Sequence, residues 1–92
     1  MIKSFKHKGL KLFFDSGNFS KINSEHRKKI RLILTMLNAA KEVKDLNFPG
    51  SGLHQLKGEY QGFWSVYVSG NWRIIFKFID SDVFEVDYLE YH

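Results

Sequence analysis

The last third of the chain alternates between apolar and other side chains with a period of two. The alternating apolar residues form three runs, which are Trp64, Val66 and Val68; Trp72, Ile74, Phe76 and Phe78; and Phe84, Val86 and Tyr88. Turn-forming residues separate these runs at 69–71 and 80–82. Alternation of this kind is typical of strands that bury one face. The sequence therefore predicts an antiparallel three-stranded meander over 63–89.

Both hairpins are expected to have three-residue loops, because that register places every large apolar residue of the meander on one face. A shift by one residue would send the shifted strand's apolar side chains to the other face. The expected pairs are Val68 with Trp72, Val66 with Ile74, Trp64 with Phe76, Ile79 with Val83, Phe78 with Phe84, Phe76 with Val86, Lys77 with Glu85, and Ile74 with Tyr88.

The same register defines the opposite face, which carries most of the polar residues of the strands. Arg73 lies in the middle strand across from Leu89, with Asp87 and Tyr91 as diagonal neighbours. A cross-strand ion pair with Asp87 is one reading of Arg73, and phosphate binding by its planar guanidinium is the other. We expect Arg73 and Tyr91 to lie close together, with His92, the last residue, beside them.

Helical spacing comes before the strands. One short helix is expected from about Leu10 to Gly17, and a longer one from about Asn23 to Lys41, where Asn23 or Ser24 can cap it. The buried stripe of the longer helix is Ile30, Ile33, Leu34 and Leu37, widened by Leu32, Met36 and Ala40. Residues 2–7 alternate as an edge strand would. The predicted fold class is α+β, with an N-terminal strand and two helices packed on a mainly antiparallel sheet.

Composition narrows the classes of function. The 92 residues suit a single domain spanning 1–92. The net charge is +4, and the first 31 residues hold nine Lys or Arg against two acidic residues. This basic half indicates either an anionic partner, such as RNA, DNA or a ribosome, or simply a soluble basic surface. Charge alone favours neither of these two alternatives. There is no Cys, and the charged N-terminus is unlike a signal peptide, so we expect a cytoplasmic protein.

A few residues could carry chemistry. His54 follows a Pro-Gly-Ser-Gly turn, where a lone His is more often structural than functional, and Lys57 lies three residues on. Two imidazoles, His54 and His92, together with Arg73, Lys57 and Tyr91 suit phosphodiester cleavage by acid–base catalysis. No ligand spacing for a metal and no nucleotide-binding motif is present in the sequence, so we expect neither metal nor cofactor.

The basic run 26–31 begins the longer helix. We expect His26 to lie on its charged, solvated face with Arg27, Lys28 and Lys29. The alternative for the run is contact with phosphates.

Several short motifs occur together, in an order that resembles the HigB toxins of the RelE superfamily of toxin–antitoxin systems. They are the opening residues 1–10, Leu53-His54-Gln55-Leu56-Lys57-Gly58, Gly62-Phe63-Trp64-Ser65-Val66, Asn71-Trp72-Arg73-Ile74-Ile75-Phe76, Asp87-Tyr88, and the final Tyr91-His92. The resemblance covers nearly the whole chain and is weakest between residues 18 and 52.

The resemblance implies a RelE-like fold and a ribosome-dependent endoribonuclease that cuts mRNA in the decoding A site and so inhibits translation. It also implies a HigA-like antitoxin as partner, with operator DNA bound through the toxin–antitoxin complex. The family's functional positions fall on His54, Lys57, Arg73, Tyr91 and His92. Where the family has Asp before its final Tyr-His, this chain has Glu90, whose carboxylate reaches one methylene further.

The resemblance also suggests roles for these residues. His54 and His92 are the acid and the base, in either order; Lys57 and Arg73 hold the scissile phosphate; Tyr91 stacks on or hydrogen-bonds the substrate; and Glu90 orients a His or the C-terminal segment. The alternatives are a ParE-like inhibitor of DNA gyrase, a non-catalytic basic nucleic-acid-binding module, and a degenerate toxin kept as a partner subunit.

Overall fold

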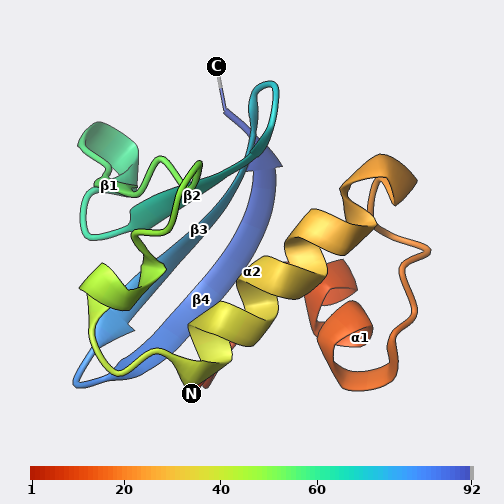
Figure 1. Cartoon of the computed structure of the whole chain (residues 1–92), viewed down its shortest axis with the longest axis horizontal. Coiled ribbons are helices and arrows are strands. Elements are labelled where there is room, and N and C mark those ends of the chain that lie inside the picture. The colour runs from red at the N-terminus through yellow and green to blue at the C-terminus, as the bar shows by residue number, and fades with distance from the viewer. Residues whose placement is uncertain (92) are drawn as a thin grey trace.

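The computed structural model describes residues 1–91 (Figure 1). Its helices are α1 (Lys8–Ser16) and α2 (Arg27–Ala39), and its strands are β1 (His54–Gln55), β2 (Trp64–Ser69), β3 (Trp72–Ile79) and β4 (Asp82–Glu90). Single turns of 3-10 helix lie in the connections, as η1 (Ser24–His26), η2 (Val43–Leu46) and η3 (Gly58–Tyr60).

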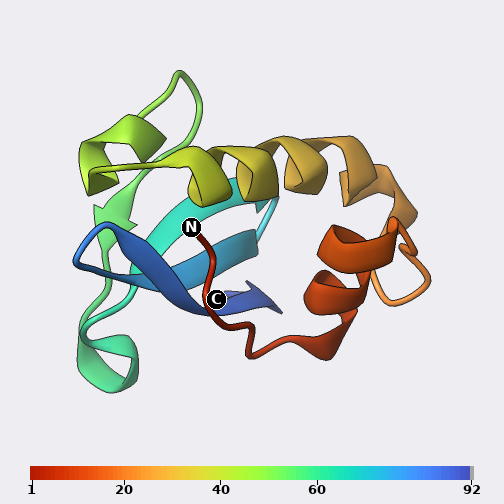
Figure 2. The same cartoon turned by 90° about the horizontal axis from the view of Figure 1, so that it is seen from below.

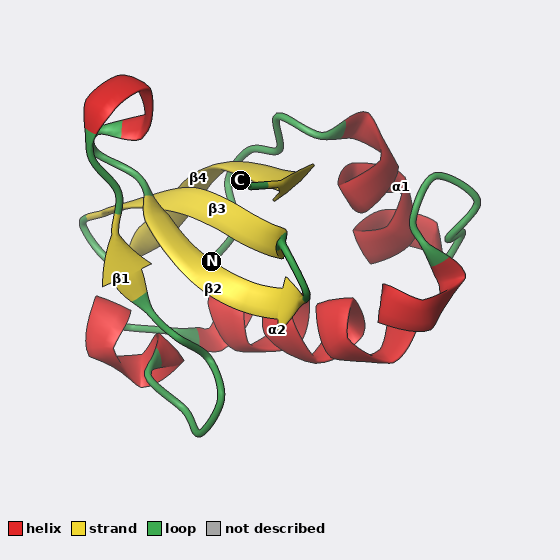
Figure 3. Ribbon diagram, turned by 90° about the horizontal axis from the view of Figure 1, so that it is seen from above, coloured by secondary structure: helices red, strands yellow, loops and turns green. Residues whose placement is uncertain are grey.

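The strands form one antiparallel sheet in the order β1-β2-β3-β4. Figure 2 shows α2 across one face of this sheet and η3 on the opposite side, and Figure 3 shows α1 at the end remote from β1. The expected N-terminal strand is present only as two isolated parallel bridges to β4, Ile2 with Val83 and Phe5 with Val86. The predicted α+β class, with two helices packed on an antiparallel sheet, is confirmed.

Helix α1 is capped at both ends, by the side chain of His7 at its start and by the backbone of Gly17 at its end. Nδ1 of His7 accepts a hydrogen bond from the backbone N–H of Leu10 at 3.1 Å, which caps the first turn. Gly17 ends the helix at φ 78°, a conformation that favours glycine. Leu10 and Phe13 are buried against the core.

Helix α2 buries the predicted stripe. Asn23 Oδ1 accepts from the backbone N–H of Glu25 at 3.1 Å and so caps the turn η1 that leads into the helix. All four stripe residues are buried. The expectation for Leu32 was wrong, because its side chain is 50 % exposed: it lies two positions from Ile30 and Leu34, too far around the helix to face the sheet.

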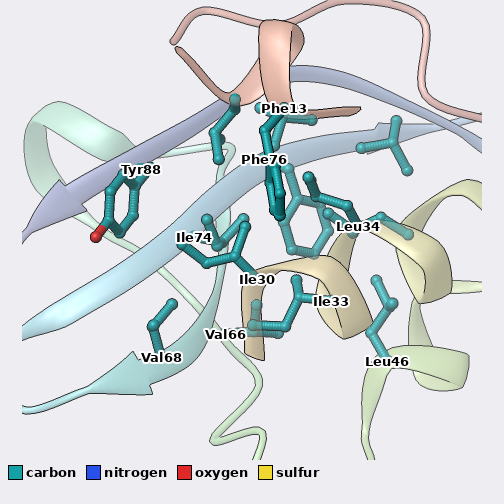
Figure 4. Close-up of a cluster of buried hydrophobic side chains, with 14 of the residues drawn as sticks. Phe13, Ile30, Ile33, Leu34, Leu46, Val66, Val68, Ile74, Phe76 and Tyr88 are labelled. Atoms are coloured by element: carbon teal, nitrogen blue, oxygen red, sulfur yellow. The ribbon is translucent and has the colours of Figure 1, made fainter. Parts of the chain in front are cut away.

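The main core lies between the helices and one face of the sheet (Figure 4). Phe76 of β3 is fully buried at its centre, with Ile74 beside it on the same strand. Ile30 and Ile33 of α2 and Phe13 of α1 cover them from the helix layer.

The hairpin between β3 and β4 differs from the prediction near its turn. Asp80 and Ser81, both with positive φ (50° and 68°), form a two-residue turn, so Ile79 pairs with Asp82 instead of Val83. Such turns match the right-handed twist of the strands. A β-bulge at Glu85 (φ 54°) absorbs the extra residue.

That bulge has two consequences. Before it, Val83 enters the core in place of Phe84, contrary to the expected face. Beyond it the predicted register returns, with Ile74 paired with Tyr88 and Arg73 paired with Leu89. The expected pairing of Lys77 with Glu85 was wrong, because Lys77 pairs with Phe84, although the side chains of Lys77 and Glu85 still form an ion pair at 2.9 Å.

The hairpin between β2 and β3 shows a similar shift near its turn. Trp64 pairs with Phe76 and Val66 with Ile74, as predicted. An irregularity between Tyr67 and Ser69 then pairs Ser69, not Val68, with Trp72. None of the helices in residues 1–91 is long and apolar enough to span a membrane.

Candidate active site

The second face of the sheet carries a smaller apolar cluster and the predicted site. Leu56, Phe63 and Ile75 form the buried part of this cluster, and Tyr60, Leu89 and Tyr91 pack against it. The connection from β1 through η3 to β2 covers only part of the face (Figure 2). Charged and polar side chains occupy the remainder.

Two rows of paired residues cross this face. Tyr67, Arg73 and Leu89 lie opposite one another on β2, β3 and β4. In the next row, His54 pairs with Ser65, which pairs with Ile75. Because paired residues of a sheet point to the same side, His54 and Arg73 share this face. Two strand spacings of about 4.8 Å separate their strands, a span that the long arginine side chain can cross.

Arg73 is held at the centre of the sheet without a carboxylate. Its Cζ lies 5.7 Å from the centroid of the Tyr67 ring, and a β-carbon at Gly52 would lie 3.8 Å from its Nη1. Within residues 1–91, Nη1 is buried and has no hydrogen-bond partner, and the guanidinium forms no ion pair. The alternative of an ion pair with Asp87 is therefore not found, since Asp87 Oδ1 accepts instead from the backbone N–H of Tyr88 at 2.9 Å.

His54 is exposed at the edge of the sheet and has a defined orientation. Its Nδ1 lies 2.9 Å from the carbonyl oxygen of Gly52. A carbonyl can only accept, so Nδ1 carries a hydrogen, and in the neutral ring Nε2 keeps its lone pair available for a proton. Gly52 therefore lies near both residues: its carbonyl oxygen is 2.9 Å from Nδ1 of His54, and a β-carbon placed on it would lie 3.8 Å from Nη1 of Arg73.

Tyr91 lies at the diagonal position that the register predicted. Its backbone N–H donates to the carbonyl oxygen of Asn71 at 2.6 Å, which fastens the end of the chain beyond β4. Its ring lies 6.0 Å from the ring of Tyr60 and belongs to the second cluster. Two half-buried aromatic rings therefore border the open part of this face.

Lys57 and Glu90 are not brought to Arg73 by any contact in residues 1–91. Lys57 is exposed and lines a hollow of about 500 Å³ with Gln55 and Gln61, among others. Glu90 pairs with Trp72, whose ring packs on the main core, so alternation places Glu90 on the helix-covered side of the sheet. His92 lies outside the described residues.

His26 was predicted as solvated surface, and this was wrong. It is only 5 % exposed, and its Nδ1 lies 2.6 Å from the hydroxyl oxygen of Tyr88. Its ring meets Trp72 edge-on at 5.7 Å. The start of α2 folds over the end of the sheet, so this imidazole completes the core rather than a site. Nothing in the local sequence distinguishes it from its basic neighbours.

Sequence reasoning assigned no role to Tyr67, although its predicted position faces Arg73. The only signal available was the cross-strand pair itself. Within residues 1–91, no group of three or more His, Cys, Asp or Glu side chains is arranged to hold a metal ion. The site is therefore an imidazole, a guanidinium and a border of aromatic rings on a basic protein, a set of groups that can move a proton and hold a phosphate.

The chain is similar to known toxins over its full length. The family model described as a RelE-like toxin of the type II toxin–antitoxin system HigB matches residues 3–92. The protein named Endoribonuclease HigB, from Proteus vulgaris, is 45 % identical over 92 residues, covering all of both chains.

Solved structures share the fold at lower identity. The heterotetrameric YoeB–YefM toxin–antitoxin complex from Staphylococcus aureus contains a chain with a TM-score of 0.61 and 17 % identity, covering 100 % of this chain and 95 % of that one. YafQ from E. coli has a TM-score of 0.54 and 20 % identity, covering 96 % and 89 % of the two chains. The predicted resemblance is confirmed: this chain belongs to the HigB family of RelE-like toxins of type II toxin–antitoxin systems, a family that includes a curated endoribonuclease.

Proposed function

We propose that this chain is an endoribonuclease that depends on the ribosome and cuts mRNA in the decoding A site. The observation that carries the proposal is that His54 and Arg73 both lie near Gly52 on one face of the sheet. His54 donates through Nδ1 to the Gly52 carbonyl and leaves Nε2 open, while the Arg73 guanidinium lies near the same residue without a carboxylate partner among residues 1–91. A proton acceptor and a phosphate-binding cation on one face suit attack within an RNA strand.

In the proposed reaction, Nε2 of His54 takes the proton of a ribose 2′-hydroxyl, and the 2′-oxygen attacks the adjacent phosphorus. The bond from phosphorus to the 5′-oxygen breaks, and His92 protonates the departing oxygen. Arg73 neutralises the charge that develops on the non-bridging oxygens. The products are a 2′,3′-cyclic phosphate and a 5′-hydroxyl end. General acid–base catalysis of this kind contributes roughly 100- to 10,000-fold to the rate.

The remaining predicted residues are assigned to binding. Tyr91, next to Tyr60, offers an aromatic surface on which an unstacked base can rest. The exposed Lys57 attracts the RNA backbone from the adjoining hollow. Glu90 supports the C-terminal segment from the helix side of β4.

The family also implies a partner. Membership of a type II toxin–antitoxin family supports an antitoxin that binds and neutralises this chain. We propose that the antitoxin is HigA-like and that operator DNA is bound through the toxin–antitoxin complex. Growth arrest on expression of this chain should be relieved when the antitoxin gene adjoining its own is co-expressed.

The test combines purified protein, ribosomes and a defined mRNA, with cleavage mapped by primer extension. The wild type should cut ribosome-bound mRNA, and Arg73→Ala and His54→Ala should each lower the cleavage rate by roughly 100-fold or more. Lys44→Ala is the control, because Lys44 is exposed in the turn η2 and forms an ion pair with Glu42, the residue that precedes this turn. Absence of cleavage together with blocked gyrase supercoiling would establish the ParE-like alternative. Salt-sensitive RNA binding without turnover would establish the non-catalytic one.

A further inference from the structure

The ring of Tyr67 lies close to the Arg73 guanidinium. The two residues are directly paired across β2 and β3, and both side chains point to the open face. The separation of 5.7 Å between Cζ and the ring centroid lies within the range of about 6 Å over which a cation and a ring attract each other. The Tyr67 ring is 36 % exposed, so the attraction acts in a partly desolvated place.

The Tyr67 side chain is itself anchored. Its hydroxyl oxygen accepts a hydrogen bond from the backbone N–H of Gly70 at 2.9 Å. Its own backbone N–H donates to the carbonyl oxygen of Ser51 at 2.7 Å, which draws the loop before β1 against β2. A β-carbon at Gly52 would lie 3.6 Å from Cβ of Tyr67. Tyr67 is therefore tied both to the loop before β1 and to the turn after β2, with the guanidinium of Arg73 close to its ring.

An aromatic ring holds an arginine in a way that a carboxylate cannot. A carboxylate would fix the guanidinium but would also neutralise it and compete with a phosphate for the same N–H groups. The ring restricts the side chain and leaves its charge and its outward N–H groups available. Within residues 1–91 no ion pair takes over this task for Arg73.

We propose that Tyr67 is a positioning residue that orients Arg73 towards the scissile phosphate. This inference rests on the proposed function, because it assigns Tyr67 a part in the same cleavage. Tyr67 acts through Arg73 and does not itself contact the reacting atoms.

The first test is a double-mutant cycle on the rate of mRNA cleavage at saturating ribosomes in single-turnover conditions. Tyr67→Leu should slow cleavage about 5- to 20-fold in the wild-type background and less than about 2-fold in the Arg73→Ala background, because residues that act through one another are not additive. Tyr67→Phe keeps the ring and loses only the bond to Gly70, so it should retain most of the activity. A full effect of Tyr67→Leu in the Arg73→Ala background would mean that the ring contacts RNA directly, and no effect in either background would remove its role; either result overturns the proposal.

The second test does not depend on catalysis. The Nε–H resonance of Arg73 should shift on Tyr67→Leu, as the ring current is lost, and should stay close to its wild-type position in Tyr67→Phe. Titration with inorganic phosphate should perturb this resonance, with a weaker apparent affinity in Tyr67→Leu. An unchanged resonance and phosphate response in Tyr67→Leu would overturn the proposal. If even the wild type cuts no mRNA, the proposed function fails, while these spectra still decide whether Tyr67 orients Arg73.

Discussion

The two faces of strand β3 differ in their polarity and in how far their polar groups are hydrogen-bonded. On the helix side, Ile74 and Phe76 are fully buried in the main apolar core. On the other side, Nη1 of Arg73 is buried and has no hydrogen-bond partner in residues 1–91. The hydroxyl oxygen of the neighbouring Ser65 is also buried without a hydrogen-bond partner there. Unsatisfied buried polar groups lower stability. One face of the sheet therefore stabilises the fold, and the other carries polar groups without partners, which lowers the stability of the fold.

The largest expected effect breaks the helix-covered face. Phe76→Ala should lower the free energy of unfolding by about 3–5 kcal/mol, because the packed core cannot collapse into the space of a phenyl ring. Ile79→Ala is the control on the same strand: Ile79 is 52 % exposed, so its loss should change stability by less than about 1 kcal/mol. Urea unfolding followed by circular dichroism measures both. Equal losses for the two variants would contradict the division between the faces.

A smaller effect tests the open face. Gly52→Ala and Gly50→Ala both put a side chain at positive φ (55° and 83°), which costs roughly 1–2 kcal/mol in each. Only the β-carbon at 52 would contact Tyr67 and Arg73, at 3.6 and 3.8 Å, since nothing lies within 4 Å of that at 50. Gly52→Ala should therefore slow mRNA cleavage several-fold more than Gly50→Ala at a similar loss of thermal stability. Parallel losses of activity in the two variants would show that the contact with Arg73 does not matter.

The smallest expected effect concerns the pH dependence of stability, through Tyr88 at one end of the helix-covered face. Burial raises the pKa of the Tyr88 hydroxyl above its ordinary value of 10.0. The folded state then keeps its proton where the unfolded chain has lost it, so this contribution to stability is complete below pH 10 and declines as the pH rises beyond it. Tyr88→Phe should show a shallower fall in stability between pH 9 and about pH 11, measured by thermal unfolding. An identical fall in wild type and Tyr88→Phe would mean that other groups cause the alkaline loss.

Much of the sheet could be predicted because the errors in the predicted hairpin loops are compensated within the strands. Both predicted hairpin loops were too long by one residue, yet the register at Arg73 is correct, because the bulge at Glu85 takes up the residue that the two-residue turn releases. The burial requirement of the face enforces this correction. The positive φ angles of Asp80, Ser81 and Glu85 could not be predicted, because the alternation of apolar residues carries no information about them.

The site was predicted less completely than the sheet. The family resemblance supplied His54, Lys57, Arg73, Tyr91, His92 and Glu90, and their roles remain proposals. The register by itself placed Tyr91 diagonal to Arg73. The register did not predict the burial and the contacts of these residues, because these properties depend on segments that are far away along the chain.

The sequence by itself determined the two helices, the three-stranded meander and the face on which Arg73 lies, since these follow from local periodicity and the need to bury apolar side chains. Tertiary structure alone decided that His26 is buried against Tyr88, that Glu90 lies on the helix side, and that His54 and Arg73 both lie near Gly52. These outcomes depend on how the loop before β1 and the start of α2 fold back over the sheet. Such contacts join residues with no periodic relation, so their physical cause is packing in three dimensions.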